Sequence, residues 1–349
     1  MMRRAKAVLT ASLSSCFSAC LLVSCGAPSA TEPSLETHQA SEAEADASSV
    51  LDEGAEDAAE GAVRFTDILA QYQALNARLD RVAARLQLAS AELCPVTIRS
   101  PGYKVHTLSD YPAQLRPVAA ALLDVDERLS VRAVRGGGPA EAAGLRPGDK
   151  LRAIKGQPLA SGPTQHMFYD RVSATAFEGE TAVLTVLRGE RALTLTIAPQ
   201  TLCGYPALVV YDEAINGRTD GREVFITSAL MRTVQNDVHL ALIVAHEMAH
   251  AIEGHLQLSP IDAERKALEL RADSMALVML ARAGFNIDEA VAYWTRADNP
   301  QRQSQSRSET HPSITERLEN FESVQRAVRQ AKLRGETLGG EALDFSIIP

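Results

Sequence analysis

The segment HLALIVAHEMAHAIEGH, residues 239–255, places two histidines four positions apart in an apolar run without glycine or proline before Gly254. Such a run favours a helix. Residues four positions apart lie on one face of a helix, so His246 and His250 can direct their imidazoles at one ion, with Glu247 one position around. The spacing therefore predicts a helix that carries two metal ligands and a neighbouring carboxylate.

Zinc is the metal that a pair of neutral imidazoles suits. A catalytic zinc keeps a position open for water and lowers the pKa of that water toward ~7. Glu247 can take a proton from the water and pass it to a leaving amine. The motif therefore indicates peptide hydrolysis with one Zn²⁺ per chain, although the same five-residue pattern also occurs in helices by accident.

A second helix is expected in IDAERKALELRADSMALVML, residues 261–280, with Glu269 and Asp273 four positions apart on one face. A carboxylate from a second helix completes a His₂Glu site of the kind that catalytic zinc uses, which makes Glu269 the expected third ligand. Asp273 can then orient a ligating histidine. In the alternative interpretation, both carboxylates are solvated and pair with Arg265 or Arg271.

A further histidine occurs in SETHPSITER, residues 308–317, where His311 precedes Pro312 at an expected helix start. A histidine held by such a turn can donate a hydrogen bond to the oxyanion of a tetrahedral intermediate. Taken alone, such a residue is more often a cap or a surface histidine. His255 follows His250 by five positions and is expected to point away from the ligand face, so it is left out of the metal set.

The chain has 349 residues, 46% of them hydrophobic, and a formal net charge of -9. It is long enough to bury a core and is expected to hold more than one folded unit. No cluster of Lys and Arg stands out after the N-terminal segment, and a nucleic-acid-binding protein would normally show a basic face. We therefore expect no nucleic-acid partner, while the oligomeric state is not indicated.

The N-terminal segment is typical of an export signal, with the basic start MMRRAK and an apolar stretch after it. The stretch ends at LVSC, residues 22–25, which resembles a bacterial lipobox and implies cleavage before Cys25 and lipidation of that cysteine. A simple cleaved signal and an uncleaved anchor are the alternatives. Gly26 is not the aspartate that favours inner-membrane retention, so the resemblance implies a lipid-anchored envelope protein at the periplasmic face of the outer membrane.

Two features follow from the composition after the signal. Residues 27–62 are rich in Ala, Ser, Glu and Asp and contain no Lys or Arg, so we expect a disordered acidic tether. Only Cys94 and Cys203 remain after Cys25. An even pair in an oxidising compartment favours one disulfide, and two buried free thiols are the alternative.

Two further segments have a readable pattern. Apolar residues at helical spacing, among them Leu69, Leu75, Leu79, Val82, Leu86 and Leu88, predict an amphipathic helix in residues 65–93. The segment GPAEAAGLRPGDKLRAIKGQPL, residues 138–159, followed by a hairpin at Arg188-Gly189-Glu190, resembles the PDZ domain attached to bacterial envelope proteases. That resemblance implies binding of an extended peptide at a sheet edge. The usual Gly-hydrophobic-Gly-hydrophobic loop is missing upstream, so a structural or regulatory insert is the alternative.

The motifs HEMAH, ELRAD and THPSITER, preceded by NGRTDGREVFIT, together resemble the CAAX-protease-type, HtpX-like zinc metallopeptidases of the gluzincin group. This resemblance spans residues 203–334. It implies zinc ligation by His246, His250 and Glu269, with Glu247 as the general base.

The same resemblance implies roles for residues around the ligands. Asp273 is expected to orient a ligand, His311 to stabilise the transition state and Arg317 to lie near the site. The strand Glu223–Thr227, with Val224 and Ile226, is similar to the edge strand along which substrate lies as an added strand. Asn216 and Gly221 are expected to shape the approach of the substrate to that strand.

The expected fold class is α+β, with a mainly helical zincin-type metallopeptidase domain, a small edge β-sheet and an inserted β-rich PDZ-like domain. The expected divisions are a signal and lipobox (1–25), a disordered acidic tether (26–62), an N-terminal helix and start of the peptidase unit (63–125), a PDZ-like domain (126–200), a zinc metallopeptidase domain (201–335) and a C-terminal tail (336–349).

The expected function is that of a membrane-anchored zinc metalloendopeptidase acting on misfolded or unassembled envelope proteins. One alternative is a non-proteolytic PDZ-type binding or chaperone-like lipoprotein with a structural zinc site. A second alternative is an exopeptidase that trims short peptides.

Overall fold

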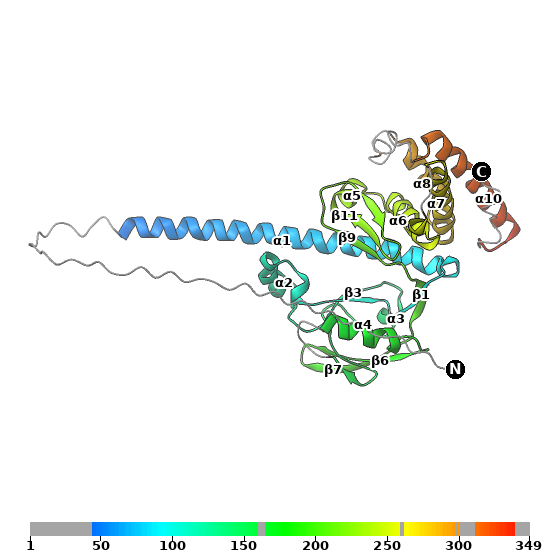
Figure 1. Cartoon of the computed structure of the whole chain (residues 1–349). Helices are drawn as coiled ribbons and strands as arrows, with labels where there is room; N and C mark the ends of the chain where they lie inside the picture. Colours follow the sequence, from blue (N-terminus) through cyan, green and yellow to red (C-terminus); the bar gives the residue numbers. More distant parts are fainter. Residues whose placement is uncertain (1–43, 160–164, 259–261, 297–298, 300–310, 339–349) are drawn as a thin grey trace, which may run out of the picture. The chain divides into compact units, whose positions relative to one another are not determined.

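The computed structural model describes residues 44–159, 165–258, 262–296, 299 and 311–338 (Figure 1). The expected signal, Cys25 and the first part of the expected tether lie outside these residues. The chain divides into two units between residues 55 and 56. No helix in the described part of the chain has the length and apolar character of a membrane-spanning segment.

Helix α1 (Glu44–Ala89) begins earlier than the sequence predicts (Figure 1). The expected disordered tether is corrected for residues 44–62, which belong to this helix, because their abundant alanine and glutamate have high helix propensity. Further along, the predicted apolar face is buried in the main core through Leu75, Leu79, Val82 and Leu86. Leu88 was expected on that face but is exposed.

The term helical body is used here for α1 together with the described part of residues 203–338, and the term insert for the described part of residues 101–199. A two-stranded ladder connects the two. After a 3-10 turn, η1 (Ala91–Leu93), strand β1 (Thr97–Ser100) pairs antiparallel with β8 (Gln200–Cys203). A disulfide joins Cys94 to Cys203, with the Cα atoms 5.5 Å apart. The ladder and the disulfide therefore tie together the chain segments that enter and leave the insert.

The insert has its own sheet, with the strand order β2-β3-β4-β6-β7 and β5 paired to β4. Its strands are β2 (Tyr103–His106), β3 (Ser130–Val134), β4 (Lys150–Ile154), β5 (Gln157–Pro158), β6 (Ala182–Arg188) and β7 (Arg191–Ile197). Its helices and 3-10 turns are η2 (Leu108–Asp110), η3 (Ala113–Leu115), α2 (Arg116–Leu123), α3 (Pro139–Ala142) and α4 (Gln165–Ala176). A separate apolar core lies under this sheet.

Two details of the insert bear on the sequence predictions. β6 and β7 form the predicted hairpin, where Gly189 adopts φ +58°, a conformation that glycine accepts without steric cost. β2 pairs with β3, so the sheet includes residues that precede the expected boundary at residue 126.

The helical body contains a three-stranded sheet with the order β10-β11-β9. Its strands are β9 (Ala207–Val210), β10 (Gly217–Thr219) and β11 (Val224–Thr227). β11 runs antiparallel to β10 and parallel to β9. The segment predicted as an edge strand is therefore the middle strand, and β10 is one of the two edges.

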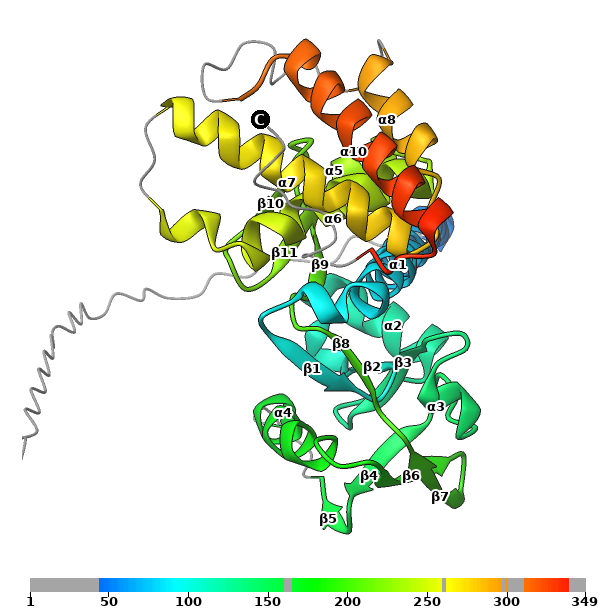
Figure 2. The same ribbon diagram turned by 90° about the vertical axis from the view of Figure 1, so that its right-hand side faces the viewer.

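Helices complete this body. They are α5 (Ser228–Thr233), α6 (Asp237–Ile252), α7 (Asp262–Arg282), α8 (Ile287–Thr295) and α10 (Ile314–Arg334), with the 3-10 turn η4 (His255–Gln257) after α6. Side chains of Asn236, Asn286 and Ser313 cap the starts of α6, α8 and α10. α7 contacts both α6 and α10 (Figure 2). The expected α+β class is confirmed, and the contact between α6 and α7 positions the site.

Candidate metal centre

Two helices bring the three expected ligands together. α6 carries His246 and His250 one turn apart, and α7 carries Glu269. The Nε2 atoms of the two histidines lie 3.1 Å apart. The oxygens of Glu269 lie 3.3 Å from Nε2 of His246 and 3.4 Å from Nε2 of His250. Both histidines therefore face the carboxylate with the same ring nitrogen.

This donor set fits a zinc ion. One ligand atom from each of the three residues lies within 4.8 Å of the others. A tetrahedral zinc ion with bonds of about 2.0–2.1 Å holds its ligand atoms roughly 3.3 Å apart, close to the separations seen here. Two imidazoles and one carboxylate leave a position open, as in catalytic rather than structural zinc sites.

Asp273 and Arg317 lie behind the ligands. Asp273 Oδ1 is 2.9 Å from Nδ1 of His246, on the far side of that ring from the ligand atom. Arg317 donates hydrogen bonds of 2.7 Å to both oxygens of Asp273 and one of 3.1 Å to Glu269. The Arg317 guanidinium also lies 4.5 Å from the ring centre of Trp294. The two residues therefore touch ligands and hold their orientation.

The protonation of the ligands is uneven. Burial disfavours a charge on His246, but hydrogen bonds with Asp273 and Glu269 outweigh it and raise the pKa of His246 to about 10. Burial, helped by the positive charge on His246, lowers the pKa of His250 to about 3. Burial opposes the charge on Glu269, yet the hydrogen bond with His246 holds the pKa of Glu269 well below its usual range. A metal ion that binds both imidazoles has to displace the proton on His246.

His255 was expected to point away from the ligands, and that expectation was wrong. α6 ends at Ile252, and Gly254 adopts φ +67°, which turns the chain back into η4. His255 Nδ1 then lies 2.9 Å from Nδ1 of His250. Helical periodicity gave the wrong direction because His255 does not belong to the helix.

Strand β10 runs beside the expected general base. A β-carbon placed on Gly217 would lie 3.2 Å from Ile243, 3.3 Å from Ile226 and 3.7 Å from Cγ of Glu247. The absence of a side chain at Gly217 therefore allows β10 to approach α6 at the position of Glu247. Burial raises the pKa of Glu247 above its usual value, which favours a carboxylate that exchanges protons nearer neutral pH.

The four residues expected to contact substrate have different environments. Val224 and Ile226 are fully buried, because β11 is the middle strand and turns these side chains into the core. This corrects the expectation that they line the substrate. Asn216 is exposed and accepts a backbone hydrogen bond from Thr227 at 3.0 Å. Gly221, with φ +87°, lies in the turn between β10 and β11, so Asn216 and Gly221 flank β10.

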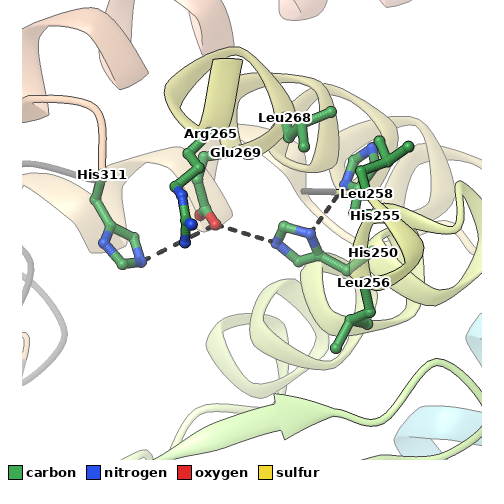
Figure 3. Close-up of a pocket in the computed structure, with 8 residues that line it drawn as sticks. All are labelled: His250, His255, Leu256, Leu258, Arg265, Leu268, Glu269 and His311. Carbon is green, nitrogen blue, oxygen red and sulfur yellow. Dashed lines mark hydrogen bonds and ion pairs between the residues drawn. The ribbon is translucent and has the colours of Figure 1, made fainter. Parts of the chain in front are cut away.

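A pocket with a volume of about 290 Å³ lies beside the ligands (Figure 3). Its lining residues are His250, His255, Leu256, Leu258, Arg265, Leu268, Glu269 and His311. His311 Nε2 is 4.0 Å from Glu269 Oε1, and Figure 3 shows it on the other side of Glu269 from His250. Pro312 follows, and Ser313 caps α10 with a capping box, so the helix start holds His311 at the rim.

Two segments of the chain match models of known families. Residues 206–263 match the model of peptidase family M48. The chain contains an M48 metallopeptidase domain. Residues 112–198 match the PDZ domain model, so a PDZ domain is inserted ahead of the M48 match.

Individual proteins resemble parts of the chain. The mitochondrial metalloendopeptidase OMA1 of Saccharomyces cerevisiae is 26% identical over 139 residues, which cover 29% of this chain and 40% of that protein. The match thus spans less than half of the length of this curated relative. Among solved structures, the HtrA3 PDZ domain bound to a phage-derived ligand is 22% identical, covers 31% of this chain and 93% of that chain, and has a TM-score of 0.24. The HtrA-type protease AlgW with a decapeptide is 28% identical, covers 30% of each chain, and has a TM-score of 0.24.

The M48 match contains β9 to β11 and α6, with the two histidines and Glu247, but ends before Glu269. The contact between α7 and α6 therefore adds Glu269 and Asp273 to the site of the M48 domain. Periodicity missed His255, although a glycine at position 254, directly before it, is a common signal for the end of a helix.

Proposed function

We propose that this chain is a zinc metalloendopeptidase that hydrolyses internal peptide bonds. The convergence of the Nε2 atoms of His246 and His250 on the Glu269 carboxylate carries this proposal. Within the described ranges of the chain, this is the one group of three or more His, Cys, Asp or Glu side chains suited to a metal ion. We therefore propose one Zn²⁺ per chain.

The chain's own residues supply the remaining steps. When bound, zinc polarises the scissile carbonyl and lowers the pKa of the attacking water. Glu247 accepts a proton from the attacking water and delivers it to the leaving amine. His311 donates a hydrogen bond to the developing oxyanion. Asp273 and Arg317 keep the ligands oriented while these steps occur.

An extended substrate fits the edge of β10. This strand ends the three-stranded sheet and passes beside Glu247. A peptide that pairs with the free edge as an added strand is held along its backbone next to the general base. Only a locally unfolded chain can pair in this way, which supports misfolded or unassembled proteins as the substrate class.

The pocket adds a preference for apolar side chains. Leu256, Leu258 and Leu268 form its apolar wall beside His250 and Glu269. A substrate side chain that enters this pocket lies next to the bond to be cut, and apolar side chains are the ones that misfolded proteins expose. Quality control of envelope proteins therefore follows as the proposed biological role.

The location is proposed from the N-terminal segment. LVSC, residues 22–25, supports a lipid on Cys25 that holds the enzyme at the periplasmic face of the outer membrane. The disulfide between Cys94 and Cys203 is compatible with an oxidising compartment. The PDZ domain is proposed to capture an extended segment of the substrate before cleavage.

Cleavage of an unfolded protein tests the catalytic proposal. Full-length protein, treated with chelator and then reloaded with one equivalent of zinc, is incubated with unfolded casein, and the fragments are identified by mass spectrometry. Internal cuts that need zinc are expected. Glu247→Gln should retain zinc and lose about 10²–10⁴-fold in rate.

Each other result has a defined meaning. Cleavage by Glu247→Gln at the rate of the parent would contradict the role of the base. Removal of terminal residues alone would indicate an exopeptidase. Zinc binding and suppression of aggregation without any cleavage would indicate the non-proteolytic, chaperone-like alternative.

Lipidation has a separate test. Cells that express the full chain are labelled with radioactive palmitate, with Cys25→Ser as the control. Label in the outer-membrane fraction that disappears in Cys25→Ser is expected. Equal labelling of the two chains would contradict the proposed anchor.

A further inference from the structure

His255 is a buried histidine to which the proposed function gives no role. Its side chain is 5% exposed. Nδ1 lies 2.9 Å from Nδ1 of His250, and Nε2 lies 3.3 Å from an oxygen of Glu253. Arg271 donates a hydrogen bond to the same oxygen of Glu253. A continuous row of polar contacts therefore runs from a proposed zinc ligand to an arginine on α7.

The row of contacts determines which nitrogens carry protons. Nε2 of His250 faces His246 and Glu269 and has to be free of a proton to bind a metal. The proton of a neutral His250 then sits on Nδ1, where the atom within reach is Nδ1 of His255. For His255 to accept this hydrogen bond, its own proton has to be on Nε2, which faces the carboxylate of Glu253. A single assignment of tautomers thus satisfies every contact in the row.

We propose that His255 is a positioning residue that fixes the tautomer and the ring orientation of His250 for metal binding. The inference rests on the metal site of the proposed function. His255 touches a ligand and none of the reacting atoms.

The other histidine ligand has a comparable support. Asp273 contacts Nδ1 of His246 and is itself held by Arg317. For His250, the supporting group is the imidazole of His255, which is held by Glu253 and, through Glu253, by Arg271. Each ring is therefore oriented from its Nδ1 side, and each row ends at an arginine that compensates a carboxylate.

The local sequence produces this arrangement. Glu253 is the C-cap residue directly after α6, and Gly254 has φ +67°, a conformation that glycine adopts readily. These two residues reverse the chain within one turn. Glu253 and His255 consequently come from the same turn and reach back toward α6.

Zinc affinity in full-length protein tests the proposal. Zinc dissociation constants are measured by competition with a chromophoric chelator. His255→Phe keeps a ring but removes the acceptor, and we expect it to weaken zinc binding by about 10–100-fold. His255→Asn keeps an oxygen near the position of Nδ1 and should restore affinity to within about threefold of the parent. His166→Phe, a change of the same kind in the insert, should leave the affinity unchanged.

A measurement on the unmodified protein needs no variant. In zinc-loaded protein with ¹⁵N-labelled histidine, we expect His250 to be protonated on Nδ1 and His255 on Nε2. A scalar coupling between the two Nδ1 atoms across the hydrogen bond is also expected. A proton on Nδ1 of His255, or an unprotonated Nδ1 on His250, would overturn the proposal.

A purely structural role gives a different pattern. In that case His255→Phe lowers the stability of the metal-free protein toward urea but leaves the zinc dissociation constant of the folded protein unchanged, and the proposal is wrong. A different result would contradict the proposed function alone: zinc binds with an affinity that depends on His255, but casein is not cut. Casein cleavage together with zinc binding that is indifferent to His255 would refute only the positioning role.

Discussion

At the residue scale, Arg317 is a buried cation that donates hydrogen bonds to two carboxylates, Asp273 and Glu269. It is 1% exposed and pairs with Asp273, which is also 1% exposed. Removal of one partner from a buried ion pair strands the other charge, at a cost of about 3–5 kcal/mol. We therefore expect Arg317→Met to lower the free energy of unfolding of the metal-free protein by about that amount, measured by urea denaturation.

The same helix offers a matched control. Arg329, also on α10, pairs with Asp288 at 2.6 Å, but both side chains are 58% exposed. Solvent screens such a pair, so Arg329→Met should cost less than about 1 kcal/mol. An equal decrease in the free energy of unfolding of the two variants would show that burial of the pair between Arg317 and Asp273 is not what stabilises the site.

A second residue-scale prediction concerns pH. Burial, with a contribution from the positive charge of Arg132, lowers the pKa of His106 from 6.5 to about 4. Between these values the unfolded chain binds a proton that the folded chain does not, so the contribution of His106 to stability is lost as the pH falls through this window. The loss amounts to at most about 3 kcal/mol.

The measurement compares unfolding free energies at pH 4.5 and pH 7. His106→Gln should show a smaller decrease on acidification than the parent protein. His166→Gln changes a histidine whose side chain is 37% exposed and which contributes least of the four causes to the pKa of His106, so it should keep most of the decrease of the parent. An unchanged decrease in His106→Gln would mean that other groups cause the acid sensitivity.

At the element scale, the approach of β10 to α6 depends on one glycine. A β-carbon at Gly217 would come within 3.2 Å of Ile243 and 3.3 Å of Ile226, tighter than ordinary packing. Gly217→Val should push β10 away from Glu247 while the ligands on α6 and α7 stay in place. We expect kcat/KM for an unfolded substrate to fall by about tenfold or more with zinc content unchanged.

Arg218→Val is the control for this strand. It introduces the same side chain at the next position of β10, which is exposed. Its effect on kcat/KM should stay below about threefold, since the substituted side chain points away from α6. Similar losses in both variants would indicate that β10 contributes through its side chains rather than through its distance from the base.

The elements also show what the sequence was able to predict. Long periodic segments, such as those of α6 and α7, were located correctly because their spacing reflects contacts within one helix. β10 was missed because three residues between two turns carry no alternating pattern. β11 was placed at an edge because alternation of apolar residues marks a strand but not its neighbours. The position of His255 depended on where α6 ends, and Gly254 was the residue that could have indicated it.

At the scale of the whole molecule, the chain enters and leaves the insert through the β1–β8 ladder, and the insert also packs on α1 through Leu69, Tyr111 and Leu115. Ser100 pairs with Gln200 at one end of the β1–β8 ladder, and Thr97 pairs with Cys203 at the other. The two cysteines are 109 positions apart. A crosslink that closes a loop of this length restricts the unfolded chain strongly, and loss of a native disulfide typically costs about 2–5 kcal/mol.

The variant Cys94→Ala/Cys203→Ala tests the contribution of the disulfide to stability. Alanine is used instead of serine because Cys203 is fully buried and a serine there would bury a hydroxyl group. We expect its free energy of unfolding to be lower by about 2–5 kcal/mol. Reductant should bring the parent to the stability of the variant and leave the variant itself unaffected. Zinc affinity should stay within about twofold, because the ligands lie on α6 and α7, which the crosslink does not join. Equal destabilisation of both proteins by reductant would show that the reductant does not act through the disulfide. Loss of zinc together with the disulfide would show that the connection to the insert supports the metal site itself.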